Sequence, residues 1–216
     1  IITTFAGYLT TFFPILVNQA ELFTIGSFTL RVGNALTFTV CTLLLWGVHF
    51  IILNGLENAG KINFVATATK VIGFLLFIVI GLFAFQKANI FPFVAPRYDE
   101  LGQSIGLLGQ VNGAAVATLW AFVGVESAIV FASRAKKPID VKRATTIGLL
   151  IALTIYVGIS TLVLGMLSHD ALIVSDKPLI DAISTVLGPI GGKILAAIGL
   201  ISLFGSTVGW VMLSAE

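Results

Sequence analysis

Long apolar runs separated by polar connections constrain this chain more than any other feature. The run 34–53 has twenty residues and no Asp, Glu, Lys or Arg, and about twenty apolar residues span the hydrocarbon core of a bilayer as a helix. Four further runs and the end of another span are expected at 62–85, 112–133, 144–167, 188–213 and 1–17. Charged residues make up only 10% of the chain, against about 25% in soluble domains. The sequence therefore predicts an all-α polytopic membrane protein with a single transmembrane domain.

Composition and motifs argue against several classes of function. The net charge of +2 gives no reason to expect a nucleic-acid partner, and the single cysteine, Cys41, allows neither an internal disulfide nor a cysteine metal cluster. Neither H-E-x-x-H nor G-x-S-x-G occurs, and the two histidines lie in different segments. We therefore expect no enzyme, no cofactor and no metal site. The chain starts with Ile1 inside an apolar run, so we expect an internal fragment of a longer protein.

Basic residues are distributed unevenly between the loops. The loops 54–61 and 134–143 carry Lys61, Arg134, Lys136, Lys137, Lys142 and Arg143. The other three loops carry only Arg31, Lys87, Arg97 and Lys177, although they are longer in total. Cytoplasmic loops are enriched in Lys and Arg, so the first two loops are predicted to face the cytoplasm. The expected location is the cytoplasmic membrane of a bacterium, with several passes through the bilayer.

One carboxylate, Glu126, lies deep in the fourth apolar run, two residues after Gly124. A charged side chain at the centre of a membrane helix costs about 2.5 kcal/mol or more, and such residues mark ion pathways or pair with a partner. Glu126 is therefore a candidate for a gating or proton-linked role, with a structural hydrogen bond or a salt bridge to Lys70 as the alternative. Lys70 itself is interpreted as a snorkelling or ion-paired lysine. Gly124 either packs against a neighbouring helix or marks a helix break that lines a polar cavity.

Two tryptophans are candidates for contact with a substrate. Tryptophan usually lies in the belts where a membrane protein meets water, but Trp120 lies well inside its run. Trp210 lies near the end of the sixth run. A deep tryptophan either packs against a neighbour or faces a cavity, where its ring can hold a cation.

The block TLWAFVGVESAIV at 118–130, followed by SRAKKPIDVKRATTIG, resembles the amino acid–polyamine–organocation superfamily of transporters. The similarity is greatest to its basic amino acid/polyamine antiporters, of the arginine/ornithine type. GYLTTFFPI near the start resembles the end of that family's third helix, and FGSTVGWVMLSAE at the end resembles its eighth. The resemblance therefore covers the chain in order, and its 118–148 part is the most specific.

This resemblance implies a fold of two five-helix inverted repeats, in which helices 1 and 6 are broken, and a fragment from helix 3 to helix 8. It also assigns roles to five residues. Trp120 and Trp210 would line the substrate site, the carbonyl of Val123 would accept hydrogen bonds from the substrate at the break, and Gly124 would form the break. Glu126 would be linked to gating or proton sensing. The glycine-rich break of helix 1, which would supply the other half of the site, lies outside this chain.

The function implied is secondary active transport: an antiporter that exchanges a basic amino acid, arginine or lysine, for ornithine or a related amine by alternating access. The expected partners are the amino acid substrate and the lipid bilayer, and a homodimer is left open. Two alternatives remain. One is a permease of the same superfamily that couples another amino acid to protons, and the other is a channel or structural membrane subunit.

Overall fold

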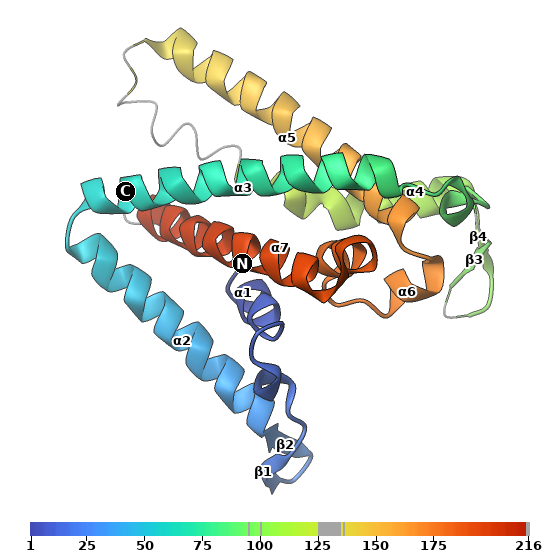
Figure 1. The fold of residues 1–216 in the computed structure, drawn as a ribbon, viewed down its shortest axis with the longest axis horizontal. Coiled ribbons are helices and arrows are strands. Elements are labelled where there is room, and N and C mark those ends of the chain that lie inside the picture. The colour runs from blue at the N-terminus through green and yellow to red at the C-terminus, as the bar shows by residue number, and fades with distance from the viewer. Residues whose placement is uncertain (95, 100, 125–134, 136, 215–216) are drawn as a thin grey trace. The chain divides into compact units, whose positions relative to one another are not determined.

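A computed structural model describes residues 1–94, 96–99, 101–124, 135 and 137–214, without the side chains of 56–59, 120 and 138 (Figure 1). The chain divides into two compact units, Ile1–Phe85 with Ile159–Glu216, and Gln86–Gly158. The first contains α1 (Ile2–Leu9), η1 (Pro14–Val17), β1 (Glu21–Ile25), β2 (Phe28–Arg31), α2 (Val32–Leu53), α3 (Leu56–Ala84), α6 (His169–Ile173) and α7 (Pro178–Ser214). The second contains η2 (Lys87–Ile90), β3 (Arg97–Tyr98), β4 (Ser104–Ile105), α4 (Leu107–Thr118) and η3 (Leu119–Ala121). Helix α5 (Pro138–Met166) runs from the second unit into the first.

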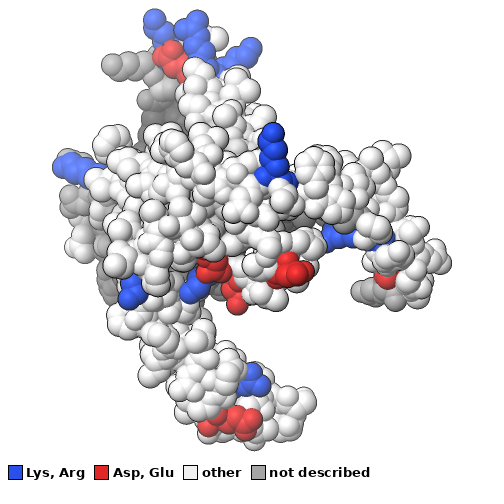
Figure 2. Space-filling view, turned by 45° about the vertical axis from the view of Figure 1, so that its right-hand side comes forward, with Lys and Arg blue, Asp and Glu red and all other residues white. Residues whose placement is uncertain are grey.

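In the part of the chain that the structure describes, four helical stretches are long and apolar enough to cross a membrane: Val32–Leu53, Gly60–Ala84, Ile139–Met166 and Pro178–Ser214. They overlap the expected runs 34–53, 62–85, 144–167 and 188–213. Large apolar side chains remain exposed over much of their length. Figure 2 shows the result as a wide uncharged surface on which the charged groups gather in a few patches. Such a surface is typical of a protein whose outer side faces lipid. The chain is therefore part of a polytopic helical membrane protein.

Helices α3 and α7 form the most extensive helix pair of the first unit and run side by side (Figure 1). Small residues allow their close approach. A Cβ atom on Gly205 of α7 would collide with the Cβ of Ala66 on α3, and one on Gly73 of α3 would lie 2.5 Å from Ile198 Cγ2. Helices in lipid gain van der Waals contact at such positions because no large side chain separates the backbones.

Helix α7 is interrupted at Gly188, where the backbone has φ 70° and ψ −175°. Glycine adopts this conformation without the steric cost that a Cβ would bring, and Pro189 suits the first turn of the helix that follows. The expected span at 188–213 is the part after this interruption. The part before it packs Ile180, Ala182 and Ile183 into the core. That core also contains Phe77 of α3, Leu195 of α7, Leu167, and the end of α5 with Leu162, Val163 and Met166.

Other elements differ from the expected runs. Helix α1 ends at Leu9, and a turn and η1 occupy the rest of 1–17. The fourth run, expected at 112–133, starts earlier with α4, whose α-helical part ends at Thr118. Two connections form antiparallel hairpins, β1 with β2 and β3 with β4. The regular structure of the described residues is otherwise helical, as expected for part of a transporter of this superfamily.

Candidate functional site

The segment that the sequence marks as a helix break is not α-helical where the structure describes it. After α4 the chain makes the 3₁₀ turn η3, which contains the backbone of Trp120, and then a turn up to Gly124. Gly124 has φ 104°, a backbone conformation that a residue with a Cβ rarely adopts. The backbone at Gly124 is therefore not that of a glycine inside a continuous α-helix. Glu126 lies outside the described residues.

The turn before Gly124 is anchored by one aromatic contact within the second unit. The ring of Phe122 meets that of Tyr156 on α5 edge to face, with centroids 5.8 Å apart and planes at 77°. Edge-to-face pairs of this kind are favourable beyond the area they bury. Val123, the next residue, is exposed. The contact therefore fixes the position of the turn against α5, while the roles of Trp120, Val123 and Gly124 in binding stay predictions.

Trp210 belongs to the first unit and lies in the last part of α7. Its side chain is partly exposed, and its carbonyl accepts a hydrogen bond of 2.6 Å from Ser214 Oγ. The five predicted site residues therefore fall into separate parts of the chain. Trp210 belongs to the first unit, and Trp120, Val123 and Gly124 belong to the second. Glu126 lies outside the described residues. The role of Trp210 as a substrate contact stays a prediction.

Lys70 is a polar residue inside a membrane span, and the sequence did not predict the environment of its side chain. Its ammonium donates a hydrogen bond of 2.8 Å to Ser206 Oγ, which links α3 to α7. The partner is a neutral hydroxyl, whereas the sequence favoured snorkelling or an ion pair. The sequence does contain a signal for a polar partner of Lys70. Ser202 and Ser206 lie one turn apart on α7, in a largely apolar span.

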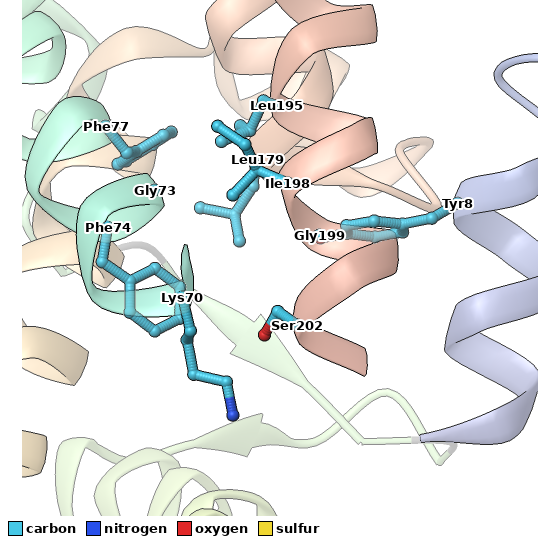
Figure 3. A pocket seen from close by; sticks show the side chains of 10 residues that line it. All are labelled: Tyr8, Lys70, Gly73, Phe74, Phe77, Leu179, Leu195, Ile198, Gly199 and Ser202. Atoms are coloured by element: carbon cyan, nitrogen blue, oxygen red, sulfur yellow. The ribbon is translucent and has the colours of Figure 1, made fainter. Parts of the chain in front are cut away.

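A small cavity of about 50 Å³ adjoins Lys70 in the first unit (Figure 3). Lys70, Gly73 and Phe74 of α3, Gly199 and Ser202 of α7, and Tyr8 of α1 contribute to its lining. Figure 3 shows Lys70 and the Ser202 hydroxyl at the same end, and the ring of Tyr8 over Gly199. A cavity of this size has room for water, which could accept from the ammonium donors that Ser206 leaves over. The cavity and Ser206 can therefore accommodate the ammonium of Lys70 inside the span.

A second polar cluster joins α1 to the start of α7. Lys177, just before α7, donates to Thr11 Oγ1 at 3.1 Å and reaches Thr10 Oγ1 at 3.5 Å. Ser175 donates a hydrogen bond of 2.6 Å to Asp181 Oδ2 in the first turn of α7. These bonds hold the end of α1 at the helix that carries Ser202 and Ser206.

These observations define the class as a multi-pass helical membrane protein with polar groups placed inside its spans. The sequence profile of the amino acid permease family matches residues 1–216, and the chain belongs to that family. It is a membrane transporter family, and the chain is part of a multi-pass protein of the bacterial cell membrane.

Three relatives illustrate the match. A Bacillus subtilis (strain 168) protein provisionally named as an arginine/ornithine antiporter is 50% identical over 216 residues, which cover 100% of this chain and 46% of that protein. The arginine/ornithine antiporter of Pseudomonas aeruginosa is 36% identical over 85% of this chain and 38% of its own length. The arginine/agmatine antiporter of Chlamydia pneumoniae is 34% identical over 81% and 37%. The chain thus spans less than half the length of each of these relatives.

Proposed function

We propose that the protein to which this chain belongs is a secondary active amino acid antiporter. It would exchange arginine or lysine for ornithine or a related amine across the bacterial cell membrane by alternating access. The observation that carries this proposal is the interruption of the fourth apolar run between Thr118 and Gly124. The names of the related antiporters support the choice of substrates.

The interruption has a chemical use inside a membrane. Non-helical backbone at membrane depth is tolerated where it lines a polar cavity, because its N–H and C=O groups then find partners there. Carbonyls at such a break, with that of Val123 as the candidate, would bind the α-ammonium of an amino acid. The rings of Trp120 and Trp210 would hold the cationic side chain. Arginine, lysine and ornithine share both groups, so one site could accept each of them in turn.

The proposal is tested with the full-length transporter in liposomes loaded with ornithine. Uptake of labelled arginine is followed, and unloaded liposomes serve as the control. Exchange predicts uptake into loaded vesicles only. Equal uptake without internal substrate would replace antiport by proton symport or facilitated entry, and uptake that does not saturate would indicate a channel. No uptake of arginine or lysine in either case would contradict the proposed substrates.

Glu126 gives the proposal a second test. A carboxylate linked to gating or to protons would make the transport rate depend on pH through its own ionisation. In the full-length protein, Glu126→Gln removes that ionisation and keeps the shape of the side chain. We expect a flattened pH profile of exchange in proteoliposomes. Asp140→Asn at the exposed start of α5 is the matched control, and a Glu126→Gln profile like that of the wild type would make Glu126 structural.

A further inference from the structure

The hairpin of β1 and β2 presents an unusual surface for a connection between helices. It joins η1 to α2 and contains the sequence ELFTIGSFTLR. Its turn is Gly26–Ser27, with Gly26 at φ 60°, as two-residue hairpin turns require. Four large apolar residues, Leu22, Phe23, Ile25 and Phe28, are exposed. Exposed apolar side chains are unfavourable in a connection that lies in water, so these residues are expected to have a partner.

The pairing register sorts these side chains onto one face. Phe23 pairs with Leu30 and Ile25 with Phe28, whereas Thr24 pairs with Thr29. Directly opposed residues of an antiparallel pair point to the same side, and successive residues alternate. Phe23, Ile25, Phe28 and Leu30 therefore form one apolar face, and the two threonines lie on the other. Leu22 lies at the register irregularity between Glu21 and Phe23, so the pairing does not assign it to either face.

The two faces differ in what they contact within the chain. Thr24 Oγ1 and Thr29 Oγ1 share a hydrogen bond of 3.1 Å on the polar face. On the apolar face, Phe23 is 48% exposed, Ile25 71% and Phe28 60%. None of the four apolar-face residues belongs to the two core clusters of the described residues. The two threonines bond to each other, whereas Phe23, Ile25 and Phe28 keep about half or more of their surface exposed on the apolar face.

The hairpin is held at the point where α2 begins. The backbone N–H of Val32 donates to Ala20 O at 2.8 Å, and that of Gly33 to Asn18 O at 2.9 Å. A Cβ on Gly33 would lie 2.6 Å from Leu16 O, so the first turn of α2 is pressed against the chain before the hairpin. These bonds use N–H groups that a helix start leaves without partners. The hairpin therefore cannot swing freely away from the end of α2.

The length of α2 indicates how deep in the membrane its first residues lie. Its 22 residues extend about 33 Å at 1.5 Å per residue, close to the roughly 30 Å of the hydrocarbon core. Large apolar side chains such as Phe38, Leu43 and Phe50 are exposed along it, as on a lipid-facing helix. The start of α2 then lies at the membrane surface, and the uneven distribution of basic residues makes this the outer surface. Figure 1 shows the hairpin at that end of α2.

We propose that the β1–β2 hairpin is an interfacial anchor whose apolar face, Phe23, Ile25, Phe28 and Leu30, lies in the outer leaflet of the bilayer. Amphipathic elements at an interface bury their apolar face about 5–10 Å into the boundary between headgroups and acyl chains. An isolated two-stranded hairpin is marginally stable in water, so lipid would also stabilise its fold. A second copy of the chain fits less well, because four partly exposed side chains offer far less than the roughly 800 Å² per partner of a standard interface.

Neighbouring residues on opposite faces provide a sharp experiment in the full-length transporter. Its native cysteines, including Cys41, are replaced, and an environment-sensitive fluorophore is attached at Ile25→Cys or at Thr24→Cys. The protein is reconstituted in phosphatidylcholine vesicles, with or without lipid brominated near the headgroup end of its acyl chains. Because the apolar face should lie within that zone, we expect brominated lipid to quench position 25 at least about twofold more than position 24. Iodide in the water should give the reverse order.

Phe28→Cys and Thr29→Cys repeat the comparison on the second strand and keep the test decisive if one variant misfolds. Equal quenching on the two faces, or no effect of brominated lipid at either, would overturn the proposal. Fluorophore pairing between copies at position 25, in place of lipid quenching, would assign the face to a second copy. The readout is independent of substrate, so it stands apart from the transport assay.

Discussion

At the scale of single residues, Lys70 shows how a membrane span holds a cation. The ammonium lies between two long apolar helices, and Ser206 accepts one of its hydrogen bonds. The nearby cavity has the Ser202 hydroxyl in an otherwise mostly apolar lining. Lys70 is partly buried, so the loss of an acceptor there costs more than a hydrogen bond contributes on average wherever water does not replace it.

This dependence predicts an asymmetry between the two partners. Ser206→Ala should destabilise the protein by about 1–3 kcal/mol, because the ammonium of Lys70 loses its acceptor. Lys70→Met should cost less, because the charge and its donors disappear together and an apolar side chain of similar length remains. The two changes together should cost no more than Ser206→Ala alone. Thermal unfolding of the detergent-solubilised protein measures these effects, with the exposed Ser214→Ala as the matched control. A stability of Ser206→Ala equal to that of the control would contradict this account.

Trp120 makes the second prediction at this scale. If its ring packs on the bound amino acid, Trp120→Ala in the full-length protein should weaken substrate binding by about tenfold or more, since tenfold corresponds to about 1.4 kcal/mol. Trp46 on α2 is the matched control, because its ring lies against His49 and Phe50 and is exposed on a lipid-facing helix. Affinity from binding of labelled arginine is the measurement. An unchanged affinity would remove Trp120 from the site.

At the scale of elements, the contact between α3 and α7 depends on the absence of side chains. Gly205→Ala would place a methyl group on top of Ala66 and force the helices apart. Overpacking of this kind costs about 1–3 kcal/mol. We therefore expect a lower Tm for Gly205→Ala and its recovery when Ala66→Gly is added, because the second change returns the lost space.

Gly158→Ala is the control for this prediction, because a Cβ there has open space around it. It should leave Tm nearly unchanged, or raise it slightly through the better helix propensity of alanine. If the double variant stayed as unstable as Gly205→Ala, the collision with Ala66 would not be the cause.

At the scale of the whole molecule, the resemblance implies that part of the substrate site lies outside this chain. The chain spans less than half of its relatives, and the resemblance places the helix 1 part of the substrate site outside it. The segment 1–216 alone should therefore give no exchange above that of empty liposomes, whereas the full-length protein should exchange. Counterflow of labelled arginine compares the two. Saturable exchange by the segment alone would show that the site is complete within it.

The sequence alone predicted the membrane class and the main spans, because long runs without charge have one stable solution in a bilayer. It left open whether Gly124 packs against a neighbour or marks a break, and the structure gives this residue a backbone conformation that is not α-helical. It did not predict the helix that precedes the interruption at Gly188, because the proline and charged residues of that segment, Pro178 and Asp181 among them, are also typical of a loop.

The tertiary structure decided the contacts between segments far apart in the chain. Residues 70 and 206 share no local pattern, and their hydrogen bond exists only because α3 and α7 come close at Gly205 and Ala66. The two faces of the β1–β2 hairpin likewise depend on a register that composition does not specify, because a shift by one residue would exchange them. Hydropathy determines which segments leave water, whereas close packing determines which polar groups then meet.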